Sequence, residues 1–274
     1  MDESSSFFLF KKLISKKIFT MVYILKYMSI FDENSFIMKT TFHSAASRGH
    51  ANHGWLNAKH SFSFASWYNP DRINFGALRV LNDDIVAAKM GFGTHPHDNM
   101  EIITIPLAGS LKHKDSMGNT SEVTTGEVQV MSAGTGVEHS EFNPNPNAEL
   151  NLFQIWIFPN KRGVEPRYDQ IRYDLSGVEN QFLQVLSPDP TDGGTWIHQD
   201  AWIHLALSTE GNTLDYSIKK EGNGIYIMNI DGMFEINGQQ LNQRDALGIE
   251  DFDNIKINTL QKGRIMVIEV PMIF

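Results

Sequence analysis

Short runs of β-branched and aromatic residues follow one another from Phe42 to the C-terminus, separated by clusters of Gly, Asn, Asp and Pro. Typical runs are FGALRVLN, EIITIPLAG, LNLFQIWIFP, GIYIMNIDG and RIMVIEVP. Helical periodicity is scarce, and GFGTHP lacks the third glycine and the following helix of a dinucleotide-binding fingerprint. The pattern therefore predicts an all-β protein made of antiparallel sandwiches or barrels.

The two halves of the chain resemble each other when glycines are used as reference points. EIITIPLAGS ends a strand near Gly109, and GIYIMNIDGMFEING ends one at Gly232 in the second half. Such a repeat indicates two similar β-barrels in tandem. We expect one barrel over residues 38–186, a second over residues 187–274, few short helices, and a linker within the turn-rich stretch SPDPTDGG.

Residues 1–37 differ from the rest because lysines interrupt their apolar stretch: Lys11, Lys12, Lys16, Lys17 and Lys26. Charges at this frequency exclude a bilayer span, which needs about 20 predominantly apolar residues. The longest uncharged run, IFTMVYIL, is short and leads into Lys26 instead of a small-residue cleavage site, so a signal peptide is not indicated. We interpret residues 1–37 as a disordered or loosely helical extension, with a membrane-surface helix as the alternative.

Composition narrows the chemistry of the chain. A formal net charge of -9 disfavours direct binding to nucleic acid, whose phosphates repel an acidic surface. The chain has no cysteine, so a disulfide framework and a thiolate metal site are both excluded. This composition suits a reducing compartment, and we expect a cytoplasmic protein.

Two short motifs in the first half carry candidate metal ligands. GTHPHDNME contains His95 and His97, and GTGVEHSE contains His139 and Glu141. Residues two apart on a strand point to the same face, so the four side chains can converge from two strands. Three imidazoles and one carboxylate suit a divalent transition metal, and an octahedral ion held by four protein groups keeps two positions for other ligands.

Other polar and aromatic residues remain open to more than one interpretation. Glu101 shares the parity of His95 and His97, so it is a candidate for facing the barrel interior as a fifth ligand or as a hydrogen-bonding partner of a ligand. We favour local hydrogen bonding for it. Surface or capping roles are expected for His43, His50, His53, His60 and His113. We expect Phe153, Trp156 and Phe158 to lie in the core, where some of them could also line a cleft for a planar ligand.

The segments THPHDNMEIITIPLAGSLKHKDSMGN and GEVQVMSAGTGVEHSE closely resemble the pirin family of the cupin superfamily. RGHANHGWLNAKHSFSFASWYNP and LNLFQIWIFPNKRGVEPRYDQ add to the likeness, which extends from about Met38 to the C-terminus and is strongest to bacterial pirin-like proteins. The resemblance implies a bicupin of two tandem antiparallel β-barrels. It also implies a metal in the N-terminal barrel held by His95, His97, His139 and Glu141.

The resemblance decides between the two candidate carboxylates. The general cupin pattern takes its carboxylate from the position of Glu101, whereas the pirin pattern takes it from that of Glu141. Fe(II) is the first expectation for the metal, with Cu, Mn, Ni, Co and Zn as alternatives. Counting from the reference glycines places Ile218 and Lys220 opposite the first histidine pair, and Ile257 and Thr259 opposite the second motif, so we expect a metal-free second barrel.

Members of the family have been associated with quercetin 2,3-dioxygenase activity. The resemblance therefore implies a metal-dependent dioxygenase that cleaves a small aromatic, flavonol-like substrate with dioxygen, with Glu141 or Glu101 taking a proton from the substrate. The alternative is a non-catalytic, iron-binding regulatory protein whose redox or occupancy state changes a surface that contacts a protein partner. A third interpretation makes flavonol cleavage a side activity towards another enol-like substrate.

Overall fold

The computed structural model describes residues 38–274, and the predicted N-terminal extension of residues 1–37 lies outside this range. The described part is one compact unit made almost entirely of strands, with two short 3₁₀ turns, η1 (Ala45–Ser47) and η2 (Ser176–Val178). Within it no helix is long and apolar enough to cross a membrane. The all-β prediction is confirmed.

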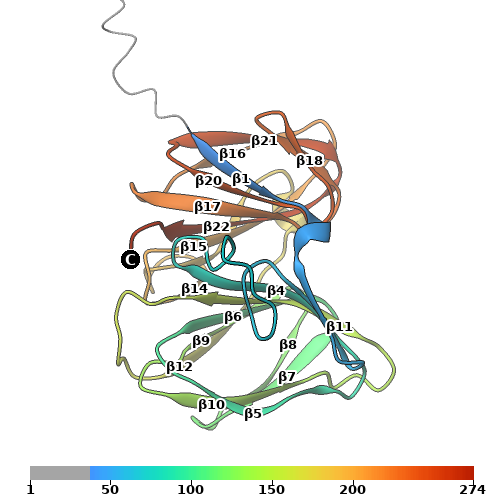
Figure 1. Cartoon of the computed structure of the whole chain (residues 1–274), viewed down its shortest axis with the longest axis vertical. Helices are drawn as coiled ribbons and strands as arrows, with labels where there is room; N and C mark the ends of the chain where they lie inside the picture. Colours follow the sequence, from blue (N-terminus) through green and yellow to red (C-terminus); the bar gives the residue numbers. More distant parts are fainter. Residues whose placement is uncertain (1–37) are drawn as a thin grey trace, which may run out of the picture. The chain divides into compact units, whose positions relative to one another are not determined.

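The N-terminal barrel consists of a seven-stranded and a four-stranded antiparallel sheet (Figure 1). In spatial order, the larger sheet contains β12 (Arg167–Arg172), β9 (Glu127–Ser132), β6 (Glu101–Ala108), β11 (Leu150–Ile157), β4 (Leu78–Val86), β3 (Leu56–His60) and β2 (Gly49–Asn52). The smaller sheet contains β5 (Gly91–His97), β10 (Val137–Phe142), β7 (Ser110–Asp115) and β8 (Thr120–Thr124).

The C-terminal barrel repeats this architecture, which confirms the bicupin prediction. Its larger sheet contains β1 (Lys39–His43), β20 (Ala246–Glu250), β17 (Asn223–Asn229), β22 (Gly263–Pro271), β15 (Trp202–Ser208), β13 (Leu183–Ser187) and β14 (Thr195–Trp196). Its smaller sheet contains β16 (Thr213–Ser217), β21 (Asn254–Gln261), β18 (Met233–Ile236) and β19 (Gln239–Leu241).

The division between the barrels differs from the one expected from the sequence. β1 pairs with β20 and so lies in the C-terminal sheet, although it comes first in the described chain. Residues 187–194, expected to contain the linker, connect β13 to β14 within that same sheet. The sequence repeat does not predict these strand positions, because the pattern of a strand indicates which of its faces are buried and not which sheet it joins.

The two larger sheets pack face to face and bury the main core between them (Figure 1). From β6 and β11 this core takes Ile103, Ile105, Phe153 and Ile155; from β17 and β22 it takes Tyr226, Met228, Met266 and Ile268. β6 is nearly continuously apolar because its odd-numbered residues face this core while its even-numbered residues face the interior of the N-terminal barrel. Only the second of these faces can contribute to a site inside the barrel.

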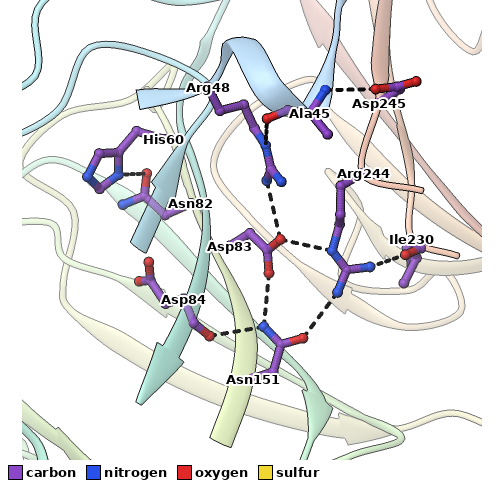
Figure 2. A network of polar contacts seen from close by, with 10 residues as sticks. All are labelled: Ala45, Arg48, His60, Asn82, Asp83, Asp84, Asn151, Ile230, Arg244 and Asp245. Carbon is purple, nitrogen blue, oxygen red and sulfur yellow. Dashed lines mark hydrogen bonds and ion pairs between the residues drawn. The ribbon is translucent and has the colours of Figure 1, made fainter. Parts of the chain in front are cut away.

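A buried ionic clasp joins the barrels around Asp83 on β4 (Figure 2). The Arg244 guanidinium, from the loop before β20, donates to Asp83 Oδ2 at 2.8 Å and to Asn151 Oδ1 at 3.1 Å, and Arg48 donates to Asp83 Oδ2 at 3.3 Å. Arg244 also donates to the Ile230 carbonyl. Each charged group in the clasp is therefore largely buried and has a charged or polar partner within hydrogen-bonding distance.

Replacing Arg244 by methionine is expected to lower the free energy of unfolding by about 3 kcal/mol, because removal of one partner leaves a buried charge poorly compensated. Urea denaturation measures the change. The matched control is Arg264→Met, which removes the more exposed Arg264–Asp231 pair; that pair should contribute about 1 kcal/mol or less. Equal losses in the two variants would contradict the interpretation of the clasp.

Candidate metal centre

Strand pairing brings the two histidine motifs side by side in the smaller sheet of the N-terminal barrel. β10 pairs with β5 so that His139 lies opposite His95 and Val137 lies opposite His97. The preceding turn depends on Gly134, which has φ +48° and whose missing side chain leaves room for the Val164 carbonyl; a Cβ there would lie 2.1 Å from that oxygen.

Three imidazole nitrogens converge on one point. The Nε2 atom of His139 lies 3.0 Å from Nε2 of His97 and 3.0 Å from Nε2 of His95. A metal–nitrogen distance of about 2.1 Å places two ligands at right angles about 3.0 Å apart. Both separations therefore fit adjacent ligands of an octahedral ion, and the three rings each offer a nitrogen within 4.8 Å of the other two.

Local contacts prepare these rings for an ion. The His95 Nδ1 atom lies 2.8 Å from the Gly93 carbonyl, which can only accept, so Nδ1 carries the proton and Nε2 presents a lone pair. Burial lowers the pKa of His97 to about 4, helped by His95, and burial lowers the pKa of His139 to about 2, helped by the neighbouring histidines. Neutral imidazole is the form that binds metals.

Glu141 is buried on β10, two residues after His139. Its carboxylate accepts hydrogen bonds from Gln154 Nε2 at 3.1 Å and from Thr104 Oγ1 at 3.4 Å. Burial raises its pKa to about 7. Glu141 has an oxygen within 4.8 Å of nitrogens of His139 and His113, whereas the group formed by His95, His97 and His139 is a separate one.

Glu101 faces away from this site. It accepts a 2.6 Å hydrogen bond from Ser132 Oγ, and Ile103 and Ile105, two and four residues further on, lie in the core between the barrels. Burial raises its pKa to about 7. The parity shared with His95 did not predict this direction, because a turn at Asn99, with φ +45°, carries the chain from β5 into a different sheet.

Three of the histidines expected at the surface are in fact buried: His43, His60 and His113. His113, which is 0% exposed, lies beside His139, with ring centroids 5.5 Å apart. The sequence SLKHKD contains a pattern that predicts the burial of His113. Lysines alternate there with Leu111, His113 and Asp115, a period of two that buries the latter three.

The three aromatic residues expected in the core, Phe153, Trp156 and Phe158, lie in two different places. Phe153 lies in the core between the barrels, and Phe158 packs against its edge. Trp156 instead contacts His97, with ring centroids 5.0 Å apart, and Phe64 packs edge-on against Trp156. The indole and Phe64 therefore form an aromatic wall next to the imidazole cluster.

A groove of about 350 Å³ adjoins the cluster at His97. It is lined by Pro96, His97, Asp98, Ser116, Gly136, Val137 and Glu138. Small-molecule sites commonly measure about 300–1,000 Å³, so the groove is large enough for a compact ligand.

Buried polar atoms without a hydrogen-bond partner concentrate in the N-terminal barrel within the described range. They belong to Asp84, His113, Gln129, His139 and Trp156 and to Ser61, which directly follows β3; one further atom, on Asn229, lies in the C-terminal barrel. Unpaired buried polar groups are costly, so their accumulation indicates a cavity built to meet an ion, water or a polar ligand.

The C-terminal barrel has different residues at the corresponding positions. β16 pairs with β21 so that Leu214 lies opposite Ile257 and Tyr216 opposite Ile255. All four side chains are buried and none is a histidine or a carboxylate. Ile218 and Lys220, expected opposite the first histidine pair, follow the end of β16.

Comparison with known proteins agrees with both barrels. Residues 41–157 match the pirin family, and residues 184–270 match the quercetinase C-terminal cupin domain. Quercetin 2,3-dioxygenase of Escherichia coli K12 is 44% identical over 227 residues, which cover 83% of this chain and 96% of the relative. A pirin-like protein of Caulobacter vibrioides is 40% identical over 222 residues, 81% of this chain and 95% of the relative.

Solved structures agree with the fold. The crystal structure of bacterial pirin YhhW from Escherichia coli in complex with nickel(II) is similar with a TM-score of 0.81 and 41% identity, covering 85% of this chain and 99% of that one. The two-barrel architecture and the extent of these matches lead to one conclusion: the chain belongs to the pirin family of the cupin superfamily.

Proposed function

We propose that the N-terminal barrel binds one divalent transition metal through His95, His97, His139 and Glu141, and that this site supports oxidative cleavage of a flavonol by dioxygen. The observation that carries the proposal is the convergence of three Nε2 atoms, with 3.0 Å separations, beside a groove. The 44% identity to a quercetin 2,3-dioxygenase supports the activity, and the nickel(II) complex of YhhW supports the metal.

Fe(II) is the metal that we propose, with Cu, Mn, Ni, Co and Zn as alternatives. Three neutral imidazoles with one carboxylate can bind all of these ions, so supply and redox chemistry decide among them. When bound, such an ion would acidify a coordinated flavonol hydroxyl and leave positions open for substrate and dioxygen.

For Glu141 to join the ligands, one carboxylate oxygen has to turn from Gln154 and Thr104 towards the imidazoles. The same carboxylate is the base that we propose for the substrate hydroxyl, since it would lie beside that hydroxyl in the loaded site and can accept its proton. Gln154 and Thr104 hold the carboxyl group when it carries that proton. Trp156 and Phe64 offer an aromatic wall to a planar substrate.

The experiment that tests this function starts from protein purified anaerobically and loaded with Fe(II). Flavonol loss and carbon monoxide release are followed after dioxygen is added, in the wild type and in His97→Ala. We expect turnover in the wild type and its loss in the variant. Fully loaded protein without turnover would favour an iron-dependent regulatory role, and equal turnover in the variant would remove the metal site from the reaction.

A further inference from the structure

His113 lies beside the imidazole cluster without belonging to it. It sits on β7, and its ring stacks on Tyr168 with centroids 5.0 Å apart and an interplanar angle of 30°. β10 pairs with β7 so that His113 lies opposite Glu141 and Asp115 lies opposite His139. The fold thus fixes His113 next to two of the proposed ligands.

The carboxylate of Asp115 sets the protonation of the His113 ring. His113 Nε2 lies 3.1 Å from Asp115 Oδ2. That carboxylate is itself held by the backbone N–H groups of Met117 and Asn119 and by the Asn119 amide. Because a carboxylate only accepts, Nε2 of the neutral ring carries the proton, and Nδ1 presents a lone pair.

The ring of His139 requires a hydrogen-bond acceptor for its Nδ1–H group. Its Nε2 atom faces His95 and His97, so a ring that binds metal through Nε2 carries its proton on Nδ1. The Nδ1 atoms of His139 and His113 are both buried, and neither has a hydrogen-bond partner in the described part of the chain. One ring nitrogen of each lies within 4.8 Å of the other, a separation that a hydrogen bond or one bridging water can span.

We propose that His113 is a positioning residue for the metal centre: its Nδ1 accepts the Nδ1–H of His139, directly or through one water, and Asp115 holds the tautomer that makes this acceptance possible. A histidine ligand with its second nitrogen bonded keeps its orientation and gains basicity. Glu141 is the other acceptor within reach, but in the proposed metal centre its carboxylate binds the ion. The inference rests on the proposed metal role of His139, not on flavonol cleavage.

The test measures the Ni²⁺ dissociation constant of the full chain by competition with a chelator. His113→Phe keeps the stacking on Tyr168 and removes both nitrogens, so we expect binding about 10–100-fold weaker than in the wild type. His113→Asn places an amide oxygen near Nδ1 and should recover most of the affinity. The matched control is Lys114→Ala, on the exposed face of the same strand, which should leave the affinity unchanged.

Two further readouts separate positioning from general packing. The ligand-field spectrum of the Co²⁺-loaded protein should change in His113→Phe and return towards the wild type in His113→Asn. In the zinc-loaded wild type, long-range ¹H–¹⁵N spectra should show neutral His113 with its proton on Nε2. A proton on Nδ1 would overturn the proposal even if no variant folded.

The outcomes distinguish this inference from the proposed function. If His113→Phe binds Ni²⁺ as tightly as the wild type while His139→Ala does not, the positioning role is wrong and the ligand set stands. If His139→Ala also binds as tightly as the wild type, both fail. Weaker binding in His113→Phe with recovery in His113→Asn supports the inference even if the loaded protein does not cleave flavonols.

Discussion

Replacing His139 by alanine is expected to weaken metal binding by more than about 100-fold, since loss of a direct ligand should exceed the about 10–100-fold effect of losing a ligand's hydrogen-bonding partner. His139 is the central member of the imidazole cluster, with its Nε2 3.0 Å from both others, and it is 1% exposed. A water molecule bound in place of the imidazole would not be held in position by the protein as the ring is. Metal content after anaerobic loading and gel filtration, together with the dissociation constant, measures the loss.

The matched control for this prediction is His50→Ala. His50 lies on β2 of the same barrel, is exposed, and contacts Asn57. Its replacement should leave metal content and affinity unchanged. Retention of a full equivalent of metal with wild-type affinity in His139→Ala would show that the ion binds elsewhere.

Replacing Glu141 by glutamine is expected to reduce flavonol turnover by about 10²–10⁴-fold, the range typical of removing a general base. Glutamine fills the same space and can still bond to Gln154 and Thr104, but it neither takes the substrate proton nor supplies a charged ligand. Turnover is measured on protein with its metal content quantified, so that a loss of metal is separated from a loss of the base.

Glu101→Gln is the comparison that makes this result specific. Glu101 is also a buried carboxyl with a raised pKa, yet it lies on the opposite face of β6 and accepts a hydrogen bond from Ser132 on β9. Its replacement should change turnover by less than about threefold, since it loses no contact to the site. Similar losses in the two variants would mean that the assignment of Glu141 as the base is wrong.

Much of the fold and part of the site could be predicted from local sequence. A period of two, glycine-rich turns and a repeated glycine pattern were sufficient for an all-β, two-barrel protein, because these features encode which faces are buried. The H-x-H and H-x-E spacings placed His95, His97 and His139 on strand faces that can meet. The structure brings these three imidazoles together.

Other features depend on which sheet a strand joins, and a single sequence does not record this. β1 completes the C-terminal sheet, and β6 belongs to a different sheet from β5, which reverses the expected direction of Glu101. The role of His113 is visible only when β7 lies beside β10. In each case the deciding contact is long-range, so local periodicity could not supply it.

The most direct test of the metal centre is diffraction from Fe(II)-loaded crystals at the iron absorption edge. The account predicts a single strong anomalous peak about 2.0–2.2 Å from the Nε2 atoms of His95, His97 and His139 and from one oxygen of Glu141. A peak elsewhere, or an ion bound by the imidazoles while Glu141 remains on Gln154 and Thr104, would contradict it.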